Sequence, residues 1–223
     1  MKIVSRVVKI TCLVVLFAVI GILIARIAMA DYFPSAMKDL SMTEGLHAAC
    51  ADDGQVEVRT QKLRASYDNP NFALFMADHL YYSPEAGELQ ITLRYNNNTL
   101  KELQHDFGLR ETPAAAVELF TYTLVSNSGK EDLSGEAIPG VSYDVAHIET
   151  DSKFMYQYLK LTFTGVSFAE TVGWYRLEIG YAGNEAAIDE NAAARWPAMI
   201  AVWEKEMIPY DEAFTLTAED FDR

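Results

Sequence analysis

Residues 89–95 read Leu-Gln-Ile-Thr-Leu-Arg-Tyr, with apolar and polar side chains in strict alternation. Successive side chains of an extended chain point to opposite sides, so the four apolar residues share one face. Gln90, Thr92 and Arg94 share the other face. The alternation predicts a half-buried strand, with its apolar face against a core and its polar face in water.

Similar signals recur along the rest of the chain. Other strands are predicted at residues 55–60, 72–82, 117–125, 142–149, 155–163, 174–181, 198–205 and 213–217. Short helices are predicted after the capping-box spacing of Ser41 and Glu44, and over residues 99–107. Roughly eight short strands at close spacing favour a mostly β fold, namely a β-sandwich of the immunoglobulin-like type.

The N-terminal segment differs from the rest of the chain in composition, because residues 10–25 are apolar and carry no charge. A membrane-spanning helix needs roughly 20 apolar residues and a signal peptide about 7–15, so this run lies between the two. Ala28-Met29-Ala30 matches a cleavage site, whereas the long run and the nearby Arg26 favour a retained anchor. Basic residues are concentrated before the run, which predicts a cytoplasmic N-terminus and an extracytoplasmic domain.

These signals predict three parts. Residues 1–30 are an anchor or signal peptide, in the membrane over 7–29; residues 31–54 are an approach segment with a short helix; residues 55–223 are the extracytoplasmic β-sandwich. The expected location is the plasma membrane with a single pass or, after cleavage at Ala30, outside the cell. The arrangement resembles the secreted immunoglobulin-like domains that follow single anchors in Gram-positive bacteria.

The net charge of the chain limits the classes of molecule that it is expected to bind. Its 223 residues include 18 basic and 32 acidic ones, for a net charge of −14, and the apolar leader holds no acidic residue. An acidic surface repels phosphate backbones, so no nucleic-acid partner is expected. Cys12 lies in the leader and Cys50 is the one cysteine outside it, so no disulfide is expected within the domain.

His147, Glu149 and Asp151 are the candidate metal-binding or acid–base residues. They alternate along a predicted strand, so their side chains would share one face. Imidazole and carboxylate groups bind metals and transfer protons. The sequence contains no zinc-site spacing of cysteine and histidine and no phosphate-binding loop, and we expect no cofactor.

Aromatic residues form the candidate binding face. Phe154, Tyr156 and Tyr158 share one side of a predicted strand, and Trp174 lies on a strand that could be its neighbour. Exposed rings on a sheet can stack on a glycan or anchor a protein partner. If a second layer covers these rings, they belong to the core instead.

Together these patterns predict a membrane-anchored binding or structural module of the cell envelope, without catalytic activity, whose partner is an envelope protein or a glycan. Two alternatives stay open. One is an extracytoplasmic hydrolase, metal-dependent or not, that uses the His147 face. The other is a soluble ligand or inhibitor domain released after Ala30.

Overall fold

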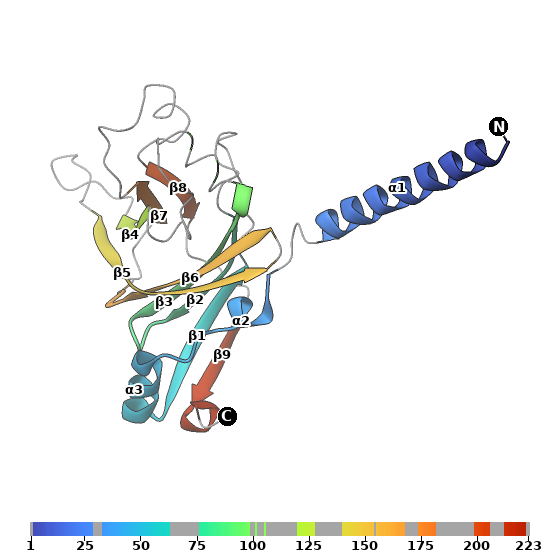
Figure 1. Ribbon diagram of the computed structural model, residues 1–223. Coiled ribbons are helices and arrows are strands. Elements are labelled where there is room, and N and C mark those ends of the chain that lie inside the picture. Colours follow the sequence, from blue (N-terminus) through green and yellow to red (C-terminus); the bar gives the residue numbers. More distant parts are fainter. Residues whose placement is uncertain are drawn as a thin grey trace. The chain divides into compact units, whose positions relative to one another are not determined.

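The computed structural model describes residues 2–28, 33–62, 76–98, 101, 105, 120–127, 140–153, 155–167, 174–181, 199–205 and 212–221. The chain divides into two compact units, Met1–Pro34 and Ser35–Arg223. The second unit contains all the strands (Figure 1). The predicted helix at 99–107 lies outside the described residues, apart from Lys101 and His105.

The first unit is dominated by helix α1, Lys2–Ala28. Within α1, Arg6–Ile27 is a run of 22 residues with a mean hydropathy of 2.9, and none of it is buried by other parts of the protein. A helix of this length and composition can cross a membrane, and a signal sequence has the same properties. The predicted apolar N-terminal helix is therefore confirmed, whereas its topology and its cleavage stay predictions.

The second unit is mostly β, as predicted, and its strands form one antiparallel sheet in the order β8-β7-β4-β5-β6-β3-β2-β1-β9. The strands are β1 (Gln55–Lys62), β2 (Met76–Ser83), β3 (Glu88–Asn96), β4 (Phe120–Asn127), β5 (Val141–Lys153), β6 (Tyr156–Thr164), β7 (Trp174–Tyr181), β8 (Met199–Lys205) and β9 (Glu212–Thr217). In the described part of this unit, the helices α2 (Ser35–Lys38), α3 (Glu44–Asp53) and η3 (Ala218–Phe221) accompany them.

The immunoglobulin-like sandwich is not confirmed, because the sheet is continuous through β5. The beginning of β5, Val141–Asp144, pairs with β4. From Val145 onward β5 pairs with β6, with a register shift between Val145 and His147. One long strand thus belongs to both halves of the sheet, as in folds whose strands switch sheets at a bulge.

Strands β3 and β6 are buried on both faces and β2 on one, and the two faces of these strands differ in chemistry. The inner face is apolar, and Leu80, Leu89, Ile91, Leu161 and Phe163 on it are each at most 1% exposed. The outer face carries two neighbouring cross-strand pairs, Tyr81 with Gln90 and Thr92 with Lys160. The prediction that 89–95 is half-buried is wrong, because Gln90, Thr92 and Arg94 are also buried.

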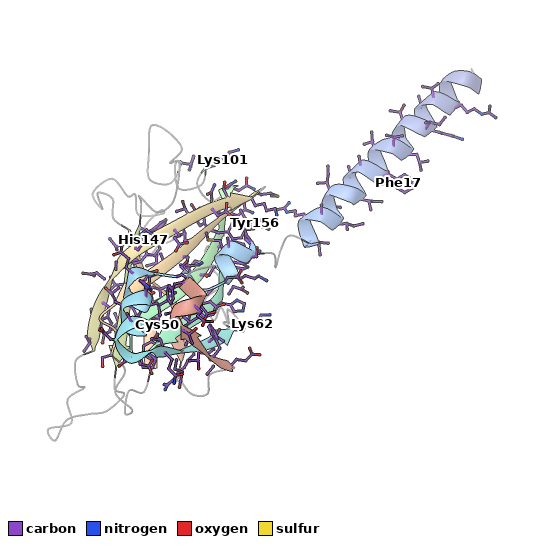
Figure 2. All side chains as sticks on the ribbon, turned by 90° about the horizontal axis from the view of Figure 1, so that it is seen from below. Phe17, Cys50, Lys62, Lys101, His147 and Tyr156 are labelled. Atoms are coloured by element: carbon purple, nitrogen blue, oxygen red, sulfur yellow. The ribbon has the colours of Figure 1, made fainter. Side chains whose placement is uncertain are left out.

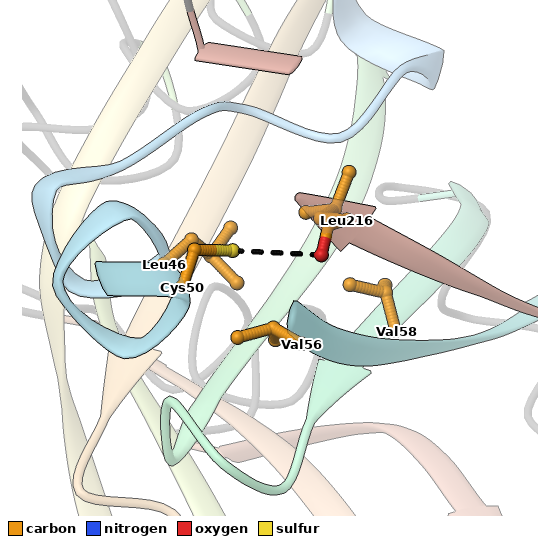
Figure 3. Packing of buried hydrophobic residues seen from close by; sticks show 5 residues of the cluster. All are labelled: Leu46, Cys50, Val56, Val58 and Leu216. Atoms are coloured by element: carbon orange, nitrogen blue, oxygen red, sulfur yellow. Dashed lines mark hydrogen bonds between the residues drawn. The ribbon is translucent and has the colours of Figure 1, made fainter. Parts of the chain in front are cut away.

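Helix α3 covers the outer face near β1 and β9. Its N-cap is Thr43, whose hydroxyl accepts from the backbone N–H of Leu46, rather than the predicted Ser41. Its C-cap is Gly54 with a φ of 78°, a left-handed conformation that glycine adopts without steric cost. Leu46 and Cys50 of α3 pack against Val56, Val58 and Leu216 (Figure 3).

Candidate functional site

The outer face holds a segment of the chain that precedes α3. We call this segment, Ser35–Ser41, the strap; it consists of α2 and the next three residues. Side chains from β2, β3 and β6 bind the strap, mostly through its backbone carbonyls. A buried carbonyl requires a hydrogen-bond donor, and here the sheet provides it.

Lys160 at the middle of β6 makes the most contacts with the strap. Its Nζ donates to the carbonyl oxygens of Ala36 at 2.7 Å and Asp39 at 2.8 Å, and to the Ser41 hydroxyl oxygen at 2.7 Å. These three acceptors match the three donors of an ammonium group. The side chain of Lys160 is only 2% exposed, and the Glu149 carboxylate lies 4.0 Å away.

Two hydroxyl groups of the sheet bind the two strap carbonyls that lie between Ala36 and Asp39. Thr92 Oγ1 on β3 donates to the Met37 carbonyl at 2.6 Å. Tyr81 Oη on β2 donates to the Lys38 carbonyl at 2.6 Å. The four successive carbonyls from Ala36 to Asp39 therefore each accept from a side chain of the sheet.

Gln90 both donates a hydrogen bond to Ser41, the last residue of the strap, and accepts one from it. Its Nε2 donates to the Ser41 carbonyl at 2.8 Å, and its Oε1 accepts from the Ser41 backbone N–H at 2.9 Å. The same Nε2 donates to Glu88 at 2.7 Å. Glu88, itself buried, also accepts from the Thr43 hydroxyl at 2.7 Å. This network joins the strap, the N-terminus of α3 and strand β3.

The electrostatics of these groups follow from burial. Burial lowers the pKa of the Lys160 ammonium, and the carboxylates of Glu149 and Asp39 oppose that shift. Burial, with the negative charges of Asp39 and Asp78, raises the pKa of the Tyr81 hydroxyl. Tyr81 therefore keeps its proton and remains a donor to the strap at neutral pH.

The candidate metal-binding residues lie on β5, the strand that pairs with β6 beside Lys160. His147, Glu149 and Asp151 pair with Thr162, Lys160 and Tyr158 of β6, so they alternate along β5 as predicted. His147 is exposed (Figure 2). Alternate residues of a strand lie roughly 6.5 Å apart, so three in a row extend too far for one ion. No group of three or more His, Cys, Asp or Glu side chains that could hold a metal occurs among the described residues.

Of the candidate aromatic face, the structure describes the side chains of Tyr156 and Tyr158. Tyr158 is 0% exposed and so belongs to the core. Tyr156 is half-buried, and the Arg94 guanidinium lies 4.5 Å from the centre of its ring (Figure 2). Trp174 is on β7, which pairs with β4 and β8 rather than with β6, and its side chain lies outside the described residues. Phe154 also lies outside them.

A different ring cluster, which the sequence did not indicate, occupies the outer face beside the strap. The His79 and Tyr81 rings are stacked with centroids 6.2 Å apart, and Phe214 meets Tyr81 edge-on at 6.5 Å. Nδ1 of His79 lies 2.6 Å from the Asp78 carboxylate. These residues come from β2 and β9, which are far apart in the sequence, and a register shift in β2 lies between Ala77 and Leu80. Only strand pairing brings them together.

The strap contacts were also missed. Alternation predicted that Gln90 and Thr92 lie on the polar face of their strand, in water. The available signal was the lysine itself, since Lys160 is the one charged residue of β6 and stands between Leu159 and Leu161.

Comparisons with known proteins do not assign the chain to a family. No protein-family model matches it, no curated protein matches its sequence, and no solved structure matches its fold. The function is therefore argued from the residues and contacts of this chain.

Proposed function

We propose that this protein is a membrane-anchored, extracytoplasmic module of the cell envelope with a binding or structural role rather than a catalytic one. Helix α1 crosses the membrane once, with the N-terminus in the cytoplasm. The β unit acts outside the cytoplasm, on an envelope protein or a glycan.

The observation that carries the proposal is α1. Its 22-residue run has a mean hydropathy of 2.9, so in water it would present a large apolar surface. Insertion into a bilayer removes that cost. Basic residues lie mainly before the run, which supports a cytoplasmic N-terminus.

The β unit begins soon after α1 in the sequence, which supports a folded module joined to its anchor by a short connection. The strap starts at Ser35, only a few residues after α1 ends at Ala28. The A-x-A sequence at 28–30 precedes the strap, so cleavage there would leave every strap contact in place. The anchored form and a released form would thus share one folded unit.

Membrane fractionation and intact mass of the expressed full-length chain test the proposal. Retention of the full-length mass in the membrane after a carbonate wash is the expected result. External protease added to intact cells should then degrade the β unit. A soluble chain that begins at Asp31 would instead support a secreted ligand or inhibitor domain. A membrane-bound chain whose β unit is protected from external protease would overturn the proposed topology.

A further inference from the structure

The contacts between the strap and the sheet are mostly polar, which is unusual for a segment that only completes a core. Obligate interfaces are mostly apolar, whereas contacts that form and break are more polar. The strap contributes one buried apolar side chain, Met37, and one that is partly buried, Leu40. Among the described residues, Tyr81, Gln90, Thr92 and Lys160 of the sheet form hydrogen bonds with it.

The groups on both sides of this contact can be satisfied by water after separation. Ser35, Ala36 and Asp39 are already exposed residues. The sheet contributes an ammonium, an amide and two hydroxyl groups, all of which water solvates well. By contrast, separating the inner face would expose Leu89, Ile91 and Leu161, which are almost fully buried. Release of the strap therefore costs much less than opening of the core.

We propose that the strap is a reversible latch, which leaves the outer face while β3 and β6 stay folded. The released segment, Ser35–Ser41, joins the residues between α1 and α2 and lengthens the connection by up to roughly 24 Å. In the anchored protein this changes how far the β unit reaches from its membrane helix. This consequence rests on the proposed anchoring, whereas the release itself does not.

Two neighbouring residues of β3 allow a matched test, because they point to opposite faces. Thr92→Val removes the hydroxyl that donates to Met37 and keeps the shape of the side chain. Ile91→Val removes one methylene from the inner face, where Ile91 is 1% exposed. Each change should weaken the native state by a similar amount, since a hydrogen bond and a buried methylene have comparable effects. Thr150→Val, at an exposed position of β5, is the control for the substitution itself.

The measurement is native-state hydrogen exchange of the full-length chain in detergent micelles. Asp39 N–H, bonded to Ser35 O, and Ser41 N–H, bonded to Gln90 Oε1, report on the strap. Amides of β3 and β6 report on the core. In the unmodified chain the strap amides should exchange at least about tenfold faster than the core amides.

The two variants then separate a latch from an integral part of the core. Thr92→Val should speed exchange of the strap amides by about 2- to 13-fold. Ile91→Val should speed exchange of the core amides by a similar factor and leave the strap amides unchanged. If Ile91→Val accelerates both sets equally, the strap opens only with global unfolding and the latch is refuted. If Thr92→Val leaves exchange of the Asp39 and Ser41 amides unchanged, the hydrogen bonds of the outer face do not control release of the strap, and the latch is refuted as well. Neither result depends on membrane retention, which fractionation tests.

Discussion

Replacing Lys160 by methionine tests the central contact of the outer face. Methionine has a similar length and no donor, so Lys160→Met keeps most of the packing and removes three hydrogen bonds. The carbonyls of Ala36 and Asp39 and the hydroxyl of Ser41 then lose their donor. We expect the variant to fold with a weakened strap, because the inner face of the sheet is untouched.

The size of the effect follows from two opposing contributions. Hydrogen bonds from a charged donor contribute about 1.5–3 kcal/mol each. Burial of the ammonium costs several kcal/mol, and methionine removes that cost. Ala36 and Asp39 are exposed residues, so water can reach part of the carbonyls that lose their donor. The net decrease in the free energy of unfolding should be about 2–4 kcal/mol. If the strap is a latch, its free energy of release sets an upper limit to this loss, because the rest of the unit stays folded without it.

Urea unfolding of the full-length chain in non-ionic detergent, followed by far-UV circular dichroism, measures this difference. In thermal unfolding of the same sample, the melting temperature should fall by about 4–16 °C, since 1 kcal/mol corresponds to roughly 2–4 °C in a unit of this size. Lys101→Met is the control, because Lys101 is exposed, and it should change the free energy of unfolding by less than about 0.5 kcal/mol. Unchanged or increased stability of Lys160→Met would refute the conclusion that this lysine holds the strap.

Three further predictions concern pH, the inner face and the end of α3. Burial lowers the pKa of Lys160 below its ordinary value of 10.5 in the folded state, so the unfolded chain binds more protons between these two values. The stability of the unmodified chain relative to Lys160→Met should therefore rise with pH in that alkaline window, as measured by urea unfolding; a fall would show that hydrogen bonding of the ammonium outweighs its burial. Leu161→Ala should lower the free energy of unfolding by about 2–5 kcal/mol, because Leu161 is 0% exposed, whereas Val141→Ala, at a position 54% exposed, should change it by less than about 0.5 kcal/mol. Gly54→Ala should cost about 1–2 kcal/mol in the same assay, because the C-cap φ of 78° places alanine in the left-handed region; a neutral result would mean that the end of α3 rearranges freely.

The strands were predictable because their signal is local. Alternation over residues 174–181 and 155–163 agrees with the bounds of β7 and β6 to within one residue. The apolar residues of these patterns became the inner face, where Leu161, Phe163, Leu177 and Ile179 are buried. Period two depends only on the pleat of the strand, so it can be read without knowing which strands pair.

The outer face was not predictable, because alternation separates apolar from polar but does not say what covers the polar side. Gln90 and Thr92 look the same in sequence whether they face water or bind a backbone. What covers them comes from residues 35–41, about fifty positions earlier in the chain. Tyr158 shows the same limit of alternation. Tyr158 alternates with Leu159 and Leu161 as an exposed ring would, yet it is buried too.

The contacts of residues 35–53 also bear on where the domain begins. Leu46 and Cys50 of α3 fill the cluster with Val56, Val58 and Leu216, and the strap provides the acceptors for Lys160. A chain that starts at Gln55 would leave the valines of β1 exposed, which is costly because apolar area loses its cover. It would also replace the strap acceptors of the Lys160 ammonium by water. The smallest fragment that keeps these contacts therefore begins at the strap, just beyond the end of the membrane helix.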